Sequence, residues 1–350
     1  MSEKLSAKNK LVVASAGSRK TTLIVEKAIA LAGKRVLITT YTNENLDQIR
    51  TYLIDRCGQV PKHVSLLSWY SFLLQDGIRP YQNFVTNAPR IDQIYFRDLP
   101  KIARFAPRSE PVKYFLTSEG NIYRDRVSEF VCVCDEYSDG LVVKRLEKVY
   151  DHVFIDELQD LAGYDLTLLE RLFGASLPIT AVGDPRQGTF STNNAAKNKK
   201  YKKSAILDWI LQHEKSGLVT MEEKNDCYRC NQAICDFADE VFPEFKKTTS
   251  MNGIKTGHDG IFIIKGCDVY KYCERNKPVI LRWNKTSDTM GLSAINIGMS
   301  KGRTYERVLI FPTNPMKLFL KTKQPDDAGD RSKLYVAVTR AKYSAAFVVE

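Results

Sequence analysis

The chain has 350 residues, of which 43% are apolar, and a formal net charge of +11. This apolar share provides the core of one or two packed domains and argues against a mainly disordered chain. The surplus of Lys and Arg favours a polyanionic partner, because these residues displace condensed counterions from phosphates. No apolar stretch reaches the roughly 18 residues that a membrane span needs, and the charged start lacks a signal peptide's apolar core. We therefore expect a cytoplasmic protein without a membrane partner.

The eight cysteines, in a chain without a secretory signal, indicate reduced thiols rather than a disulfide framework. Cys227 and Cys230 form a C-x-x-C pair, and Cys132 and Cys134 lie one residue apart. Zinc can use such pairs. The two pairs are too far apart for a compact zinc ribbon, so the sequence does not favour a zinc site.

Apolar runs and helical patterns alternate from the start of the chain. The run 11–15 leads into a loop of small residues, after which apolar residues recur with helical spacing up to Gly33. A second run, 36–38, precedes a helical pattern that Gly58 can end. Seven further apolar runs predict strands at 64–67, 153–155, 179–182, 261–264, 279–281, 308–311 and 345–349. This alternation predicts parallel sheets with helices on both faces and ligands at the carboxyl ends of the strands.

The first candidate site follows the first predicted strand, where backbone N–H groups and a helix N-terminus can bind phosphates. Lys20 can reach the β- and γ-phosphates of ATP, and Thr21 can bind Mg²⁺. The P-loop pattern requires glycine where this chain has Ala14 and Arg19, so an ordinary basic loop is the alternative. The predicted nucleotide-binding residues are Ala16, Gly17, Ser18, Arg19, Lys20, Thr21 and Thr22.

Two later strands also deliver polar residues to their carboxyl ends. Asp156 and Glu157 follow the run 153–155; the first can bind Mg²⁺, and the second can orient and deprotonate the attacking water. Gln187 follows the next strand and can hydrogen-bond the γ-phosphate or that water. Each loop, considered alone, is also compatible with an ordinary turn.

Together, the motifs resemble those of the UvrD-like branch of superfamily 1 helicases over residues 11–349. In chain order they are GSRKTT, TYTN, SWYS, IDELQD, VGDPRQ, YR, SKGRTYERV and LYVAVTRA. The resemblance implies an α/β fold of two RecA-like P-loop NTPase lobes with parallel sheets, at 1–220 and 221–350. A small helical insertion is expected in the first lobe at about 75–150. ATP and Mg²⁺ would bind between the lobes, and hydrolysis would drive movement along single-stranded nucleic acid. The resemblance implies 3′ to 5′ movement on DNA, and RNA stays open as the alternative track.

The resemblance also implies roles for residues of the second lobe. Tyr228 resembles the aromatic residue that stacks on the nucleotide base, and Arg229 and Arg340 resemble the two arginines that bind the γ-phosphate. Gly302 lies in the Lys-Gly motif of the nucleotide site, where Thr304 replaces the usual glutamate and can still bond a ribose.

Contacts with the nucleic-acid strand are expected from two further motifs. Tyr41, Thr42 and Asn43 resemble a DNA-contacting motif. Trp69 and Phe190 are the candidates for base stacking, which tolerates any base sequence. For both aromatic residues, a position in the protein core is the alternative.

Three departures from the family pattern indicate a minimal motor with limited unwinding. Arg19 replaces the glycine before the P-loop lysine, and residues 191–193 lack the aromatic platform often found there. The interval 284–299 has no room for a large second insertion. Two alternatives therefore stay open: a nucleotide-regulated nucleic-acid-binding module with little hydrolysis, and the ATPase subunit of a repair or defence complex with a separate nuclease.

Overall fold

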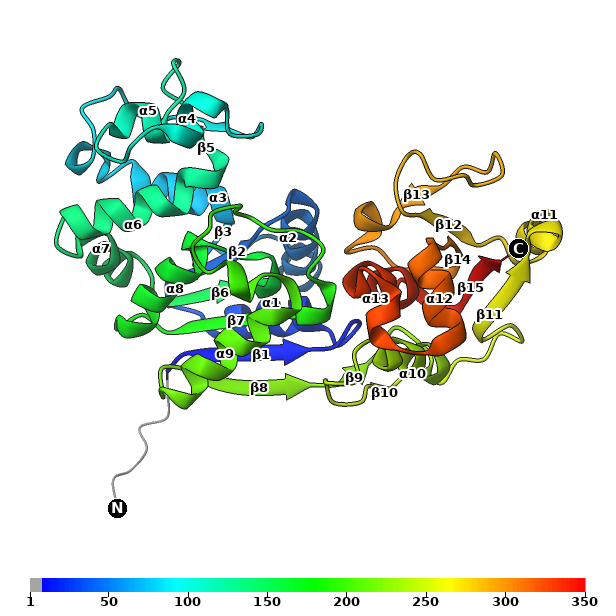
Figure 1. Cartoon of the computed structure of the whole chain (residues 1–350). Helices are drawn as coiled ribbons and strands as arrows, with labels where there is room; N and C mark the ends of the chain where they lie inside the picture. The colour runs from blue at the N-terminus through cyan, green and yellow to red at the C-terminus, as the bar shows by residue number, and fades with distance from the viewer. Residues whose placement is uncertain (1–7, 350) are drawn as a thin grey trace. The chain divides into compact units, whose positions relative to one another are not determined.

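The computed structural model describes residues 8–349, so the first seven residues of the predicted first lobe and Glu350 lie outside the described residues. The described chain forms two compact units (Figure 1). The first unit comprises residues 8–12, 21–183 and 191–222, and the second comprises 13–20, 184–190 and 223–349. Two loops of the predicted first lobe, 13–20 and 184–190, thus belong to the second compact unit.

A six-stranded sheet with the order β3, β2, β6, β7, β1, β8 forms the first core. The pairs β2 with β3, β2 with β6 and β6 with β7 are parallel. The strands are β1 (Lys10–Ala14), β2 (Val36–Thr40), β3 (Val64–Ser68), β6 (His152–Ile155), β7 (Ile179–Gly183) and β8 (Thr220–Lys224). All residues of β2 and β7 are buried, which explains why these strands are continuous apolar runs.

Nine α-helices accompany this sheet in the described part of the first unit. They are α1 (Lys20–Ala30), α2 (Asn43–Cys57), α3 (Trp69–Phe72), α4 (Lys101–Phe105), α5 (Pro111–Phe115), α6 (Val127–Tyr137), α7 (Leu141–Val149), α8 (Tyr164–Gly174) and α9 (Ile206–Lys215). Helix α2 ends as predicted, because Gly58 adopts a left-handed conformation with φ 75° and donates its N–H to the carbonyl of Ile54.

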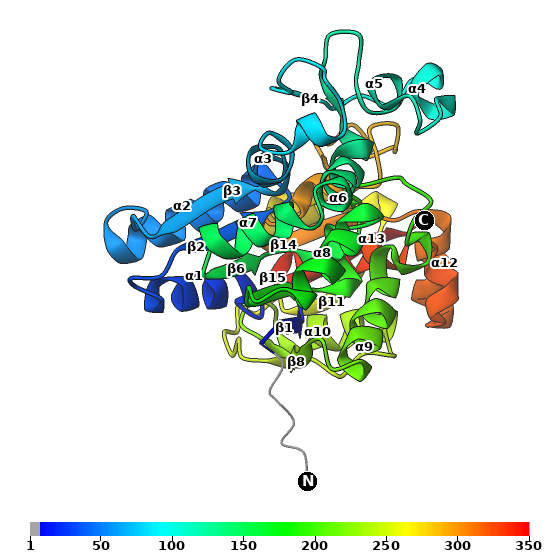
Figure 2. The ribbon, with the colours of Figure 1, turned by 90° about the vertical axis from the view of Figure 1, so that its left-hand side faces the viewer.

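The predicted insertion at about 75–150 is largely helical. It holds α4 to α7 and a small parallel pair, β4 (Ile94–Tyr95) with β5 (Ile122–Tyr123). A π-helical segment, Leu73–Ile78, leads into it from α3. Figures 1 and 2 show α4 and α5 at the end of the insertion far from the sheet, with α6 and α7 nearer to it.

The second unit contains a five-stranded sheet with the order β11, β15, β14, β12, β13, in which all neighbours are parallel. Its strands are β11 (Gly260–Lys265), β12 (Val279–Arg282), β13 (Ile295–Asn296), β14 (Tyr305–Phe311) and β15 (Ala341–Val349), and a separate short pair joins β9 (Asp226–Cys227) to β10 (Thr249–Ser250). Its helices are α10 (Gln232–Val241), α11 (Val269–Asn276), α12 (Asn314–Thr322) and α13 (Arg331–Thr339).

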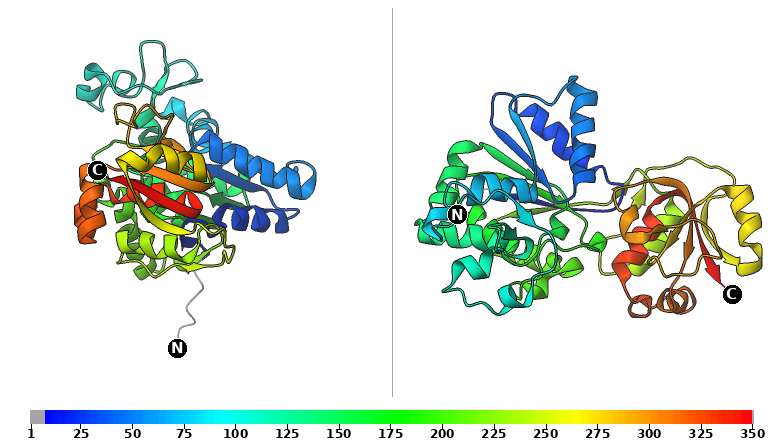
Figure 3. Two further views of the ribbon diagram at one scale, coloured as in Figure 1. Left: turned by 90° about the vertical axis from the view of Figure 1, so that its right-hand side faces the viewer. Right: turned by 90° about the horizontal axis from the view of Figure 1, so that it is seen from above.

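Alternate residues of β14 lie in two different cores. Val308 and Ile310 pack with residues of α10, α12 and α13, whereas Leu309 and Phe311 pack with residues of α11. In Figure 3, α11 (yellow) and the pair α12 and α13 (orange to red) lie on opposite sides of the strands. Helices thus cover both faces of this parallel sheet, which confirms the predicted α/β class.

All nine predicted strands are present. The two-residue strands β4, β5, β9, β10 and β13 were not predicted, and neither was the longer strand β8. The sequence of β8, TMEEK, is polar, and none of its residues is fully buried. Within residues 8–349, no helix is both long and apolar enough to cross a membrane.

Candidate functional site

The loop after β1 has the tight backbone that a phosphate-binding loop requires. Gly17 has φ 75°, and a Cβ atom there would lie 2.7 Å from Cβ of Arg229 and 2.9 Å from Sγ of Cys227. The carbonyl of Gly17 accepts the N–H of Tyr228 at 2.9 Å. Any side chain at position 17 would therefore displace the segment that carries Tyr228 and Arg229.

Arg19, at the position where the P-loop pattern has glycine, keeps a glycine-like backbone. Its φ is 60°, in the left-handed region that side chains other than Asn and Asp seldom adopt. Its guanidinium carbon lies 3.9 Å from the ring centroid of Tyr228, a close cation–π contact. The charge of Arg19 therefore lies on the ring of Tyr228, the residue predicted to stack on the nucleotide base. Tyr228 is 41% exposed.

Lys20 is buried, and its ammonium group donates to the carbonyl of Ser15 at 3.1 Å. The buried hydroxyls of Ser15 and Ser18 have no hydrogen-bond partner within residues 8–349. A buried hydroxyl without a partner costs about 1 to 3 kcal/mol, so the loop favours an added acceptor. Phosphate oxygens are such acceptors, and the ammonium of Lys20 supplies the matching charge. The donor set of this loop thus fits a nucleotide phosphate.

The residues predicted to hold Mg²⁺ are adjacent in the first unit. The hydroxyl of Thr21 donates to Oδ2 of Asp156 at 2.8 Å, and Oδ1 of Asp156 accepts the N–H of Glu157 at 3.0 Å. Among residues 8–349, no group of three or more His, Cys, Asp and Glu side chains could hold a metal ion on its own. Mg²⁺ in nucleotide sites takes only one or two carboxylates, because phosphates and waters complete its shell. The pair of Thr21 and Asp156 therefore fits Mg²⁺ that arrives with a nucleotide.

Glu157, the predicted general base, has a left-handed backbone with φ 58°. Its carboxylate accepts a hydrogen bond from the side-chain amide of Gln159. Gln159 in turn packs on Gly183, where a Cβ atom would lie 2.6 Å from Oε1 of Gln159. The glycine at the end of β7 thus leaves room for the amide that orients the carboxylate.

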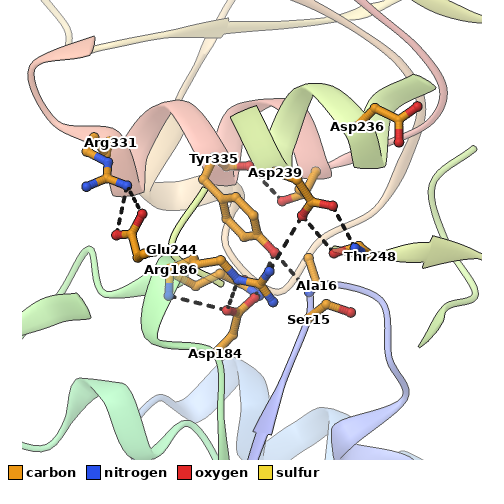
Figure 4. Close-up of polar contacts among 12 residues, drawn as sticks. Ser15, Ala16, Asp184, Arg186, Asp236, Asp239, Glu244, Thr248, Arg331 and Tyr335 are labelled. Atoms are coloured by element: carbon orange, nitrogen blue, oxygen red, sulfur yellow. Dashed lines mark hydrogen bonds and ion pairs between the residues drawn. The ribbon is translucent and has the colours of Figure 1, made fainter. Parts of the chain in front are cut away.

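A buried polar network surrounds Asp184 in the second unit (Figure 4). Asp184 accepts Nε of Arg186 at 2.8 Å, Nε2 of Gln187 at 2.9 Å and the hydroxyl of Tyr335 at 3.1 Å. The same hydroxyl accepts the N–H of Ala16 at 3.2 Å. Burial alone would raise the pKa of Asp184, but Arg186, Lys20 and these hydrogen bonds hold it below its ordinary value. Asp184 is therefore an anion that connects the P-loop to helix α13.

Arg186 extends this network to helix α10. Its side chain is 1% exposed, and its guanidinium lies 5.1 Å from the ring centroids of both Phe245 and Tyr335. A second ion pair joins Nη1 of Arg186 to Asp239 at 3.7 Å. Figure 4 shows Asp239 hydrogen-bonded to Thr248 as well. The arginine of the VGDPRQ motif is thus a fixed structural cation, held by two carboxylates.

The predicted sensor and the two predicted γ-phosphate arginines also gather in the second unit. Nη2 of Arg340 donates to the side-chain carbonyl of Gln187 at 3.0 Å, and Arg229 donates to the backbone carbonyl of Thr339 at 3.1 Å. Gly302, with φ 81°, precedes Arg303, whose carbonyl accepts Nη1 of Arg340 at 3.2 Å. Both arginines bind protein oxygens here, which fixes the position of their guanidinium groups within the second unit.

Three of the five predicted strand-contacting residues line a pocket of about 440 Å³ in the first unit, here called the motif pocket. Its lining includes Tyr41, Thr42 and Asn43 and also Tyr70 and Phe96. The rings of Tyr41, Tyr70 and Phe96 form a row with edge-to-face contacts. The ring centroids are 5.7 Å apart between Tyr41 and Tyr70 and 5.5 Å apart between Tyr70 and Phe96. Phe96 is 58% exposed, so it presents an aromatic face to solvent at the end of this row.

The prediction that Trp69 stacks on a base does not fit the structure. Trp69 is 1% exposed and packs 5.6 Å from Phe72, measured between ring centroids. Its indole N–H donates to the buried carboxylate of Asp165 at 2.7 Å. The buried carboxylate needs hydrogen-bond donors, and the indole N–H supplies one from within the core. Trp69 is therefore a core aromatic residue, which was the stated alternative.

Phe190, the other stacking candidate, is 40% exposed and lies 5.8 Å from the ammonium of Lys301. Residues 191–193, which follow Phe190, pack against the interior of the first unit. Thr192 and Asn193 are buried, and the carbonyl of Thr192 accepts the hydroxyl of Tyr70 at 2.7 Å. The missing aromatic platform is thus replaced by a packed loop behind the motif pocket.

Three residues of these candidate sites were not predicted as site residues. Phe96 lies in the insertion, outside every motif, so the sequence gives no signal for it. Arg186 and Tyr335 lie within the motifs VGDPRQ and LYVAVTRA, so their position in those motifs indicates a role in the candidate site. Their partners come from segments far apart in the chain, which the sequence does not indicate.

Residues 110–349 match the viral superfamily 1 RNA helicase core domain. No curated protein matches the sequence. Among solved structures, the chain is similar to the PRRSV helicase, with 16% identity and a TM-score of 0.47, over 98% of this chain and 52% of that one. It is similar to arterivirus nonstructural protein 10, a helicase, with 17% identity and a TM-score of 0.49, over 98% of this chain and 60% of that one. A complex of arterivirus nonstructural protein 10 with DNA gives 15% identity and a TM-score of 0.47 at the same coverage. The chain thus spans between half and three fifths of the length of these helicases.

Proposed function

The chain belongs to the viral superfamily 1 RNA helicase core domain family, and from this premise we propose that it hydrolyses ATP with Mg²⁺ to move along single-stranded nucleic acid. The observation that carries the proposal is the pairing of Thr21 with Asp156 at 2.8 Å, directly beside Glu157. A hydroxyl, a carboxylate that can share a metal with it and an adjacent second carboxylate are the groups that phosphoryl transfer to water requires.

We propose one role for each polar residue of the candidate site. Lys20 supplies a cation, and the hydroxyls of Ser15 and Ser18 are buried donors without a partner within residues 8–349, so these three groups bind phosphate oxygens. Thr21 and Asp156 hold Mg²⁺, which when bound neutralises charge on the phosphates. Glu157 takes the proton of the attacking water, and the amide of Gln159 keeps its carboxylate oriented.

The second unit would report the state of the γ-phosphate. Gln187 and Arg340 are already hydrogen-bonded to each other, and Arg229 contacts the residue before Arg340. Replacement of these protein contacts by phosphate oxygens would move α13 and its neighbours together, because Tyr335 joins the same helix to Asp184. We propose that this exchange links hydrolysis to movement.

The track and its direction are proposed from the motifs. The likeness to UvrD-like helicases supports DNA and 3′ to 5′ movement, whereas the matching family is described as one of RNA helicases. Tyr41, Thr42, Asn43 and Phe96 supply hydroxyl, amide and aromatic groups that contact either polymer. The suggested protein partner in a repair or defence complex stays a prediction.

One observation favours a second candidate function, a nucleotide-binding module with little turnover. The guanidinium of Arg19 lies on the ring of Tyr228, where a nucleotide base is expected to stack. A base would have to displace it or share the ring with it. The two candidates differ in whether nucleotide binding is followed by movement.

Displacement of streptavidin from biotinylated oligonucleotides tests the proposal directly. With ATP, the protein should displace streptavidin from the 5′ end of single-stranded DNA faster than from the 3′ end, and RNA oligonucleotides test the other track. Glu157→Gln should retain ATP and abolish displacement, whereas Lys271→Ala on the exposed face of α11 should match the wild type. Wild-type protein that binds ATP and oligonucleotide without displacement from any end would exclude a translocase.

A further inference from the structure

A second pocket, of about 500 Å³ and here called the basic pocket, is lined by residues of the insertion together with Tyr164 and residues 194–197. Four cations line it: Arg104, Arg108, Arg126 and Lys197. Asp98 and Asp125 are the only carboxylates among its lining residues, so the lining carries a net charge of +2. None of these residues belongs to the motifs of the nucleotide site or of the motif pocket.

Two of the four cations are fixed in place by one buried carboxylate. Glu129 is fully buried, and its two oxygens accept Arg108 and Arg126, with the hydroxyl of Tyr114 bonded to the same carboxylate at 3.0 Å. Two guanidinium groups on one carboxylate leave one positive charge in excess. Arg108 is 61% exposed, so this excess charge faces solvent at the pocket. Nε of Arg126 also has no hydrogen-bond partner within residues 8–349.

The basic pocket adjoins the motif pocket. Phe96 lines the motif pocket, and Asp98, two residues later, lines the basic pocket. Arg124 joins them again, because it donates to the carbonyl of Phe96 at 3.4 Å and pairs with Asp125 at 3.1 Å. A strand that leaves the motif pocket across the ring of Phe96 thus reaches the lining of the basic pocket within two residues of backbone.

We propose that the basic pocket binds backbone phosphates of the single strand that occupies the motif pocket, and so anchors the strand on the insertion. Arginines held in fixed positions by a buried acid suit phosphate oxygens, which they contact in a bidentate manner. The chemical class of ligand is single-stranded nucleic acid read through its backbone, without base specificity. The identity of the ligand rests on the proposed function, whereas the charge and the geometry of the basic pocket do not.

Binding of a fluorescein-labelled oligonucleotide, followed by anisotropy without nucleotide over a series of salt concentrations, tests this site. The variant is Arg104→Glu with Lys197→Glu, because neither residue has a hydrogen bond or ion pair to Glu129, whose buried cluster is thereby kept. The matched control is Lys271→Glu with Arg275→Glu on α11, which makes the same change in net charge at exposed positions of the second unit.

We expect the pocket variant to weaken binding about tenfold and to lower the salt slope by about 1.4, since each lost phosphate contact on a single strand removes about 0.7. The control should change affinity less than about threefold through long-range charge alone. Equal affinity and equal salt slopes for the two variants would overturn the proposal. Loss of polyglutamate binding with unchanged oligonucleotide binding would overturn it as well, in favour of an acidic peptide. Because the assay contains no ATP, a protein without ATP hydrolysis can still pass it, so the two proposals fail separately.

Discussion

At the scale of single residues, Arg19 is the position where this chain departs most from a standard P-loop. Its backbone keeps the left-handed conformation of the glycine that it replaces, and its guanidinium lies on the ring of Tyr228. We therefore propose that Arg19 affects access of the base to Tyr228 and not the binding of phosphates by Lys20.

Replacement of Arg19 by glycine should free the ring of Tyr228. A cation–π contact is worth about 0.5 to 2 kcal/mol, so we expect KM for ATP to fall by about 2- to 30-fold. We expect kcat to stay within about twofold, because Lys20 and its partners are unchanged. Steady-state kinetics of Arg19→Gly, with Arg19→Met as the control that keeps the side-chain length, measure both values. A large rise in kcat at constant KM would instead indicate that Arg19 competes for the phosphates.

The hydroxyl of Tyr335 connects the P-loop to Asp184, and Tyr335→Phe removes only that oxygen. The N–H of Ala16 and one oxygen of Asp184 would each lose a buried partner, at a cost of about 1 to 3 kcal/mol in the free energy of unfolding. KM for ATP should also rise, because the loop loses its support. Urea denaturation and kinetics measure the two effects. Tyr270→Phe, which removes an exposed hydroxyl bonded to the carbonyl of Met290, is the control. If both variants behave alike, the network does not support the P-loop.

Phe96 and Trp69 should respond to substitution in opposite ways. Phe96→Ala should weaken oligonucleotide binding by about 1 to 3 kcal/mol, the contribution of one stacked base, with little change in stability. Trp69→Phe should lower the free energy of unfolding and leave binding intact, because its N–H serves Asp165 in the core. Anisotropy and urea denaturation of both variants test this. An intact affinity in Phe96→Ala would exclude the ring as a stacking platform.

At the scale of elements, strand β6 contains a titratable group that links stability to pH. His152 stacks on Phe154 with ring centroids 4.3 Å apart, and burial, with a smaller effect of Lys27, lowers its pKa to about 4. In the unfolded chain a histidine has a pKa near 6.5, so the unfolded state binds more protons between about pH 6.5 and 4. The free energy of unfolding should therefore fall as the pH falls through this window. His152→Gln should reduce the loss in urea midpoints between pH 7 and 5, and an equal loss in both proteins would contradict the assignment.

The elements also show what a sequence can predict. Strands such as β2 and β7 were predictable because burial on both faces leaves a continuous apolar run. The loops after β1, β6 and β7 were predictable as candidate sites because parallel strands bring their carboxyl ends to one edge. Contacts such as that of Trp69 with Asp165, or of Arg108 with Glu129, depend on packing between segments that are separated in the chain. Periodicity and spacing contain no information on such contacts. The predicted role of Trp69 was therefore wrong, and the basic pocket was not predicted.

At the scale of the whole molecule, the chain combines a superfamily 1 helicase core with a net charge of +11. Residues of the insertion in the first unit contribute to the lining of two pockets. The net charge supports the proposed movement along a polyanion, because a basic surface raises the rate of encounter.

The central claim is that this core couples ATP hydrolysis to a single strand, and steady-state hydrolysis by the wild type and Lys20→Ala, with and without single-stranded DNA or RNA, tests it most directly. We predict strong stimulation of the wild type by one of the two polymers and no stimulated turnover in Lys20→Ala, which loses the cation of the P-loop. Wild-type turnover that equals that of Lys20→Ala with both polymers present would contradict the account.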